Sequence, residues 1–230
     1  MRVLGLETTG AACSAALAGP SGALAHRSEA MRRGHAEALI PMVDALLSEA
    51  GQSFQTLDGV AVTRGPGSFT SARVGLAAAR AFALAHGLPV MAVSSLALLA
   101  ECAADAVQAP VLVAAIDARR GMLYRQVFRR TGAGGLMAHD DPVEAAPSVL
   151  PDLPSAATVD APACVIGDAA GALLQQAASA RLIAGPDVTP GARELAVLAA
   201  AGRLAAHQAA PSPLYIRAPD ADRPQPSVFQ

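Results

Sequence analysis

The sequence is poor in aromatic residues and carries no concentrated positive charge. It contains no tryptophan and only two tyrosines, Tyr124 and Tyr215, and its formal net charge is −2. Its basic residues are scattered, often in pairs such as Arg129-Arg130. Proteins that grip nucleic acid use aromatic stacking platforms and basic grooves. If the chain serves a nucleic-acid process, we therefore expect another molecule to hold most of the nucleic acid.

Cysteines and long apolar runs are also scarce. Cys13, Cys102 and Cys164 are odd in number and far apart, which fits neither a disulfide framework nor a closed zinc site, so we expect buried free thiols. The opening "MRVLGLETTG" lacks the apolar stretch of a signal peptide, and no run approaches the roughly 18 residues of a membrane span. The sequence predicts a cytoplasmic protein with no membrane partner.

Apolar residues, 53% of the chain, follow a strand and helix pattern that forms one α/β unit over residues 1–104. Pro41 lies either in the first turn of its helix or inside a longer helix begun near Ala36. The expected elements, in chain order, are strands over 3–6, 11–17 and 23–28, a helix over 35–51, a strand over 59–63, a helix over 69–86, a strand over 89–93 and a helix opened by Ser94 or Ser95.

The same order begins again about 110 residues later. In "VLVAAIDARRGMLYRQVF" an apolar strand ends in Asp117, and a second strand follows a turn, just as the first strand of the chain ends in Glu7. We interpret this as an internal duplication. The remaining parts are a smaller second lobe over 105–190 with irregular edge structure over 131–162, a helix over 192–207 that packs back on the first lobe, and a proline-rich tail over 208–230.

A duplicated meander-helix-strand-helix unit with an acid at the end of each first strand resembles the two-lobed actin-like (ASKHA, ribonuclease H-like) fold. In that fold the two acids face each other across a cleft and hold Mg²⁺ and phosphates. Here the corresponding positions are Glu7, Thr8, Thr9, Asp117 and Arg119. We interpret the cleft as degenerate, because Glu7 replaces the usual Asp and "DARRG" lacks a second glycine and a hydroxyl.

The stretch "RGPGSFTSARVG" at 64–75 has the composition of a phosphate-binding turn but not its spacing. The Walker pattern fails at Thr70 or Ala72, the dinucleotide pattern fails at Thr70, and Pro66 removes a backbone amide. We predict a tight turn that starts a helix and is capped by Ser68 or Thr70. This helix-launching loop comprises Gly65, Pro66, Gly67, Ser68, Phe69 and Thr70.

The helix after this loop has small residues at Gly75, Ala79 and Ala83, one per turn. Such a face lets another helix approach closely, or it meets the protein's own core. On the first alternative, Gly75→Leu is expected to leave the monomer folded and to weaken partner binding.

Several motifs together resemble the TsaB (YeaZ) family. They are "LGLETTGAACSAAL", "GHAEALIPMVDALLSEAG", "GPGSFTSARVG", "PVMAVSSLALLA", "AAIDARRGMLYRQVF" and "SPLYIR", which cover most of residues 1–130 and a motif in the tail. The departures are Glu7 for Asp, and Ser71-Ala72 for a Gly-Leu pair.

The resemblance implies a non-catalytic subunit that binds the TsaD catalytic subunit through the two helices of its first lobe. It would support threonylcarbamoyl transfer to N6 of adenosine 37 in tRNA, with the P-loop ATPase TsaE joining and tRNA reached only through the complex. The histidine pair that holds the metal in TsaD is absent, because Leu39 stands four residues after His35. The implied interface residues are His35, Leu39, Met42, Val43, Leu46, Arg73, Gly75, Leu76, Ala79 and Ala83.

Some alternatives stay open from the sequence. No cofactor is expected on this chain alone, but ATP or ADP at the interface of the complex is one alternative, and a homodimer in the absence of TsaD is another. The competing function is an actin-fold kinase or ATPase that uses Glu7 and Asp117. A metallopeptidase is disfavoured because the chain has no histidine pair and no H-E-x-x-H motif.

Overall fold

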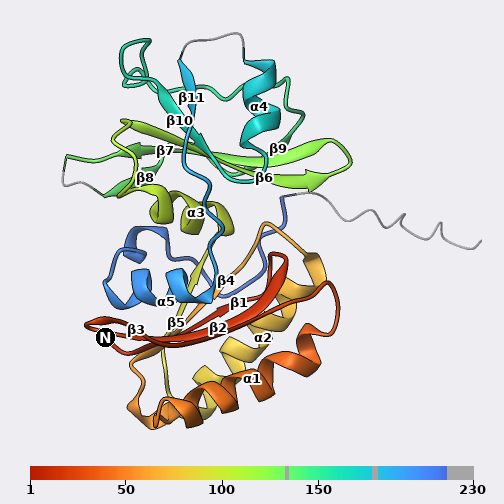
Figure 1. Ribbon diagram of the computed structural model, residues 1–230, viewed down its shortest axis with the longest axis vertical. Helices are drawn as coiled ribbons and strands as arrows, with labels where there is room; N and C mark the ends of the chain where they lie inside the picture. Colours follow the sequence, from red (N-terminus) through yellow and green to blue (C-terminus); the bar gives the residue numbers. More distant parts are fainter. Residues whose placement is uncertain (133–134, 178–180, 217–230) are drawn as a thin grey trace, which may run out of the picture.

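The computed structural model describes residues 1–132, 135–177 and 181–216, which form two lobes, each built on one sheet (Figure 1). In the first sheet the strands lie in the order β3-β2-β1-β4-β5. The strands β1, β2 and β3 pair antiparallel, while β4 and β5 continue the sheet parallel to β1. Their bounds are β1 Val3–Glu7, β2 Ala12–Gly19, β3 Gly22–Ala30, β4 Gly59–Thr63 and β5 Val90–Val93.

Two long helices, α1 (His35–Glu49) and α2 (Phe69–His86), cover the outer face of the first sheet (Figure 1). Pro41 lies inside α1, which agrees with the predicted alternative of a longer helix that begins before the proline. Ser68 is the N-cap of α2, and its side chain accepts a hydrogen bond from the Ser71 amide at 3.4 Å. A short 3-10 helix, η1 (Phe54–Thr56), links α1 to β4.

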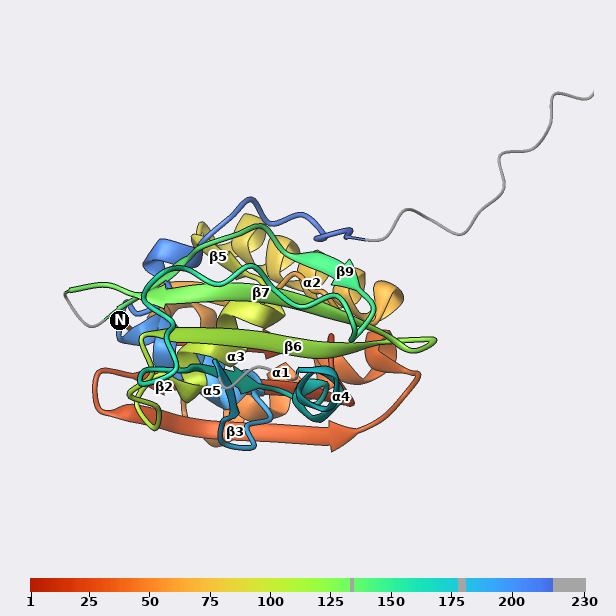
Figure 2. The same ribbon diagram turned by 90° about the horizontal axis from the view of Figure 1, so that it is seen from above.

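The second sheet has the order β11-β10-β6-β7-β8, with β9 paired to the other end of β7. Read as β8-β7-β6-β10-β11, it repeats the pairing pattern of the first sheet, so the predicted duplication and the actin-like fold are confirmed. Figure 2 shows β6 and β7 as its long strands. The bounds are β6 Val111–Arg119, β7 Met122–Arg130, β8 Leu136–Ala138, β9 Val143–Ala145, β10 Ala163–Ile166 and β11 Leu182–Ala184.

Among the residues that the structure describes, the outer face of the second sheet carries one helix, α4 (Ala170–Gln176). The position that α1 takes in the first lobe is filled by a chain without helix, from which Leu153 and Ala157 pack on the sheet. The second lobe is therefore reduced, as predicted, because its outer face has less helix than that of the first lobe. The expected irregular segment 131–162 contains the short strands β8 and β9.

The last helix of each unit packs on the sheet of the other unit. Helix α3 (Ser95–Ala103) follows β5 but buries Leu96 and Leu99 against the second sheet, with Leu98 facing the first lobe. Helix α5 (Ala192–Ala200) follows β11 but lies on the first sheet (Figure 1). The predicted boundary at 104/105 therefore separates the two sequence repeats. It does not separate the two lobes, because each sheet packs against a helix from the other repeat.

Helix α5 approaches its sheet closely. A Cβ added to Gly5 of β1 would come within 2.7 Å of the Ala192 carbonyl oxygen, so only glycine fits there. The predicted helix over 192–207 is too long. It ends at Ala200 because Gly202 takes a left-handed backbone (φ 75°) and the chain turns, and a short 3-10 helix, η2 (Ala205–His207), follows.

The first part of the predicted tail is ordered on the first lobe. The Ala209 amide donates to the Ala92 carbonyl of β5 at 2.9 Å, and the Leu214 amide donates to the Arg64 carbonyl at 2.8 Å. The rest of that tail, 217–230, lies outside the described residues.

Candidate functional site

The helix-launching loop is packed tightly against the turn that follows β1. A Cβ on Gly67 would lie 2.5 Å from the Thr9 carbonyl oxygen, and the Ser68 amide donates to that same oxygen at 3.0 Å. An amide that is bonded inside the protein is not free to bind a phosphate oxygen. The loop therefore shapes the start of α2 and ties it to the end of β1.

Glu7, the acid at the end of β1, is buried at 6% exposure and bonded to its own chain. Its Oε1 accepts hydrogen bonds from the Thr9 amide at 2.7 Å, from the Thr63 hydroxyl at 2.8 Å and from the Thr9 hydroxyl. Thr8 is also buried and donates to the Ser71 carbonyl of α2 at 2.7 Å. The contacts of Glu7 give it a structural role that joins β1, β4 and the turn that follows β1.

Asp117, the corresponding acid of the second lobe, has a side chain that is 42% exposed. Its carboxylate accepts from the Arg119 amide at 2.8 Å and the Arg119 guanidinium at 3.1 Å, while its own amide donates to Asp168 at 2.8 Å. Arg120 and Gly121 form the turn between β6 and β7, and both take left-handed backbone (φ 54° and 73°), as a two-residue hairpin requires. Arg119 is also left-handed (φ 66°), at the register shift that precedes this turn.

Neither acid belongs to a cluster of metal-ligating side chains among the described residues. Within that part of the chain no group of three or more His, Cys, Asp or Glu side chains could hold a metal ion. A cavity of about 510 Å³ opens in the second lobe, but its one charged lining residue, Asp160, would repel a phosphate. It is lined by residues 106–110, 160–162, 164 and 183–186.

Most of the predicted interface residues face the protein's own core, which corrects that part of the sequence prediction. A Cβ on Gly75 would lie 2.6 Å from Thr8 Oγ1, so the small-residue face of α2 packs on β1 and β4 rather than on a partner. Helices α1 and α2 each have one apolar face, and the first sheet covers it. The buried members of the predicted set are His35, Leu39, Met42, Val43, Leu46, Gly75, Leu76 and Ala79.

The opposite faces of the same helices are exposed. On α2 they present Phe69 (51% exposed), Arg73 and Leu84 (89% exposed), and on α1 they present Ile40. Of the predicted interface set, Arg73 is exposed and Ala83 is partly exposed. Helical spacing alone could have found this face, because Phe69, Arg73, Arg80 and Leu84 fall on one stripe at 100° per residue.

Sequence reasoning missed Tyr215, which lies beside the start of α2. Its ring is 5.1 Å from the Phe69 ring centre to centre, and its hydroxyl accepts a hydrogen bond from Arg73 Nε at 2.8 Å. The motif "SPLYIR" was the available signal, but nothing in the sequence links it to α2.

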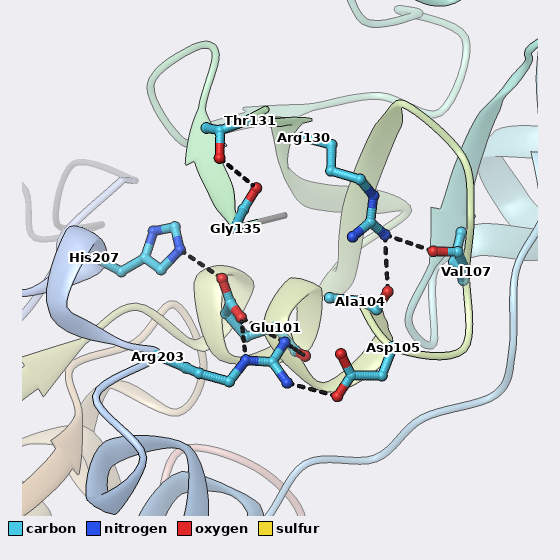
Figure 3. A network of polar contacts seen from close by, with 9 residues as sticks. All are labelled: Glu101, Ala104, Asp105, Val107, Arg130, Thr131, Gly135, Arg203 and His207. Atoms are coloured by element: carbon cyan, nitrogen blue, oxygen red, sulfur yellow. Dashed lines mark hydrogen bonds and ion pairs between the residues drawn. The ribbon is translucent and has the colours of Figure 1, made fainter. Parts of the chain in front are cut away.

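A second polar network joins α3 to the chain after α5 (Figure 3). The carboxylate of Glu101, 3% exposed, accepts from Arg203 at 2.9 and 3.2 Å and lies 3.1 Å from His207 Nε2. Arg203 also bonds Asp105 at 2.6 Å, and the His207 ring meets the edge of Phe128 of β7. This network holds the two lobes together.

The cysteines are free, as the sequence predicts. Burial raises the pKa of the Cys13 thiol to about 11 and that of Cys102 to about 12, with nearby glutamates adding to both. These thiols therefore stay protonated near neutral pH, which does not suit a nucleophile. No helix among the described residues is long and apolar enough to cross a membrane.

Comparison with known proteins gives consistent results. Residues 28–224 match the family model described as TsaD, tRNA N6-adenosine threonylcarbamoyltransferase. The chain is 40% identical over 130 residues to the tRNA threonylcarbamoyladenosine biosynthesis protein TsaB of Haemophilus influenzae, covering 56% of this chain and 55% of that one. It is 38% identical over 134 residues to TsaB of Escherichia coli, covering 58% of each. The match thus spans somewhat over half the length of these curated relatives.

A solved structure covers nearly all of the chain. It is a Pseudomonas aeruginosa protein described as an uncharacterized protein with similarity to peptidase YeaZ. It is 32% identical, with a TM-score of 0.77 over 94% of this chain and 99% of that one.

Proposed function

The chain belongs to the TsaB (YeaZ) family, and on that premise we propose that it is a non-catalytic subunit of a tRNA threonylcarbamoyladenosine-forming complex. In this proposal it binds a TsaD-like catalytic subunit and supports transfer of the threonylcarbamoyl group to N6 of adenosine 37 of tRNA. The family model it matches is described by that transferase activity, and its TsaB relatives are named for the same modification.

The observation that carries the proposal is that the two strand-end acids, Glu7 and Asp117, already accept hydrogen bonds from other groups of this chain. Three donors of the chain itself bond Glu7 Oε1, and Arg119 bonds Asp117. A carboxylate oxygen that already accepts three donors of its own chain has little capacity left to orient a hydrated Mg²⁺. The first lobe thus keeps the fold of an actin-like enzyme while its acid serves stability.

The absence of TsaD's histidine pair supports a division of labour between the two subunits. His35 begins α1 and is buried, with Nδ1 3.4 Å from the Ser71 hydroxyl of α2. Leu39, one helical turn later, is 1% exposed in the apolar core. The metal chemistry would therefore belong to the partner.

The exposed faces of α1 and α2 are the proposed docking surface for that partner. A TsaE-like P-loop ATPase would join the assembled pair, ATP or ADP would bind at the joint surface, and tRNA would be reached through the complex. The net charge of −2 supports this last point, because the chain alone offers little attraction to a polyanion.

The test is complex formation. The purified chain is mixed with the TsaD-like subunit of the same organism, with and without a TsaE-like ATPase and ATP, and analysed by size-exclusion chromatography and calorimetry. We expect a stoichiometric complex and no ATP hydrolysis by the chain alone. Absence of any complex under all these conditions, or ATP turnover that Asp117→Ala abolishes, would overturn the proposal.

A further inference from the structure

An exposed cluster of two aromatic rings and one arginine lies at the start of α2. The Arg73 guanidinium carbon is 4.2 Å from the centre of the Phe69 ring and 5.8 Å from that of Tyr215. The Tyr215 hydroxyl accepts from Arg73 Nε at 2.8 Å. A guanidinium held in this way has a fixed direction before any partner arrives.

The cluster is not explained by the stability of the chain itself. Phe69 and Tyr215 are 51% and 49% exposed, in a chain in which only 3% of the residues are aromatic. Among the described residues no carboxylate lies within ion-pair distance of Arg73. Tyrosine and arginine are among the residues enriched at binding hot spots, where partner residues cover them.

The charge of α2 indicates the chemistry of the partner. The helix from Phe69 to His86 contains Arg73 and Arg80 and no Asp or Glu. Both arginines lie on the stripe that runs from Phe69 to the exposed Leu84. A complementary surface would therefore offer carboxylates beside an apolar patch, whereas the same stripe of a second copy would set arginine against arginine.

The C-terminal segment 209–216 is anchored to the first lobe, and this anchoring positions Tyr215 beside Arg73. Backbone hydrogen bonds tie Ala209 to β5 and Leu214 to the Arg64 carbonyl, just before the helix-launching loop. The segment thus crosses from the edge of the first sheet to the start of α2. Tyr215 comes from 142 residues beyond Arg73, so the cluster exists only in the folded chain.

We propose that Phe69, Arg73 and Tyr215 form the anchor that receives a carboxylate-bearing surface of the catalytic partner, and that the segment 209–216 is part of the docking surface. This inference rests on the proposed function, and it names the chemistry of the partner at that surface. Arg73 supplies a charge-assisted hydrogen bond, and the two rings shield it from water.

The test measures the affinity of the full-length chain for the TsaD-like subunit by calorimetry at low and moderate salt. Arg73→Glu is expected to weaken binding about 100-fold, because it replaces attraction by repulsion. Tyr215→Ala is expected to weaken binding about 10-fold, because the guanidinium loses its support. Wild-type binding should also weaken with salt, and Arg73→Glu should flatten that dependence.

Arg129→Glu is the matched control, because Arg129 is exposed on β7 of the second lobe. It should bind like the wild type, and unchanged melting temperatures would show that all variants are folded. If the wild type binds, and Arg73→Glu and Tyr215→Ala both bind with the same affinity as the wild type, the inference is overturned. The proposed function then still stands. If the wild type does not bind, both fall. If the variants disrupt only self-association, the partner is a second copy and the inference is wrong.

Discussion

The two lobes share one strand order but differ in what covers the outer face of each sheet. In the first lobe α1 and α2, 15 and 18 residues long, cover that face. In the second lobe the outer face is covered by the seven-residue α4 and by a segment without helix. The inner faces do not differ in this way, because each receives one helix from the other unit, α5 or α3.

This difference shows which parts of the duplicated unit the architecture requires. Strand pairing and the exchanged helices define both sheets and join the lobes, and neither depends on the outer helices. The outer face of the second sheet could therefore lose a helix and keep its strands. In the described part of the chain, two outer helices with exposed far sides are found only in the first lobe.

Helix glycines offer the strongest test of this comparison. Gly75→Leu should destabilise the monomer by about 4 kcal/mol, because the side chain must displace Thr8 and break its hydrogen bond to α2. Urea denaturation followed by circular dichroism measures the change.

The controls for this change lie on α2 and on α4. Ala77→Leu, on the exposed face of α2, should leave stability nearly unchanged. Gly171→Ala in α4 should stabilise by about 0.5 kcal/mol, because nothing lies within 4 Å of the added Cβ. If Gly75→Leu unfolds at the wild-type urea concentration, then α2 does not pack on β1 as described.

The junction between the lobes gives the second test. Glu101→Ala should cost about 3 kcal/mol, because it leaves Arg203 and His207 without their buried acceptor. Asp105→Ala removes the other acid on Arg203, which is largely exposed, and should cost under about 1 kcal/mol. Calorimetry should show one cooperative transition for the wild type. Two separate transitions in the wild type would show that the exchanged helices do not join the lobes into one unit.

The two strand-end acids give the third and smallest test. Glu7→Ala should cost about 2 kcal/mol, because three donors lose their acceptor, whereas Asp117→Ala should cost under about 1 kcal/mol at its half-exposed position. Chemical denaturation compares the two variants directly. Equal costs would mean that the acids have equivalent roles in the two lobes.

The local elements could be predicted because their signals are local. Apolar periodicity located most strands and helices, though not the short β8 and β9. Ser68 and Ser94 cap the helices that follow them, and the repeated strand-acid-turn pattern predicted the second sheet. The predicted length of α5 was wrong because the turn at Gly202 interrupts a run of helix-forming residues.

What the small-residue face of α2 packs against could not be predicted from one sequence. The small-residue stripe of α2 fits a partner helix and the chain's own sheet equally well, and only the position of Thr8 decides for the sheet. The packing of α3 on the second sheet was likewise not predicted, because the sequence does not show which sheet Leu96 and Leu99 face.

The sequence by itself determined the duplicated α/β unit, the loop that starts α2 and the loss of the TsaD histidine pair. These depend on residue types and on spacings of a few positions. The tertiary structure alone decided that Glu7 Oε1 accepts three donors of its own chain, that most of the predicted interface residues are buried in the core, and that Tyr215 completes the exposed cluster on Arg73. Each of these depends on contacts between distant segments, which form only when both sheets and the exchanged helices are in place.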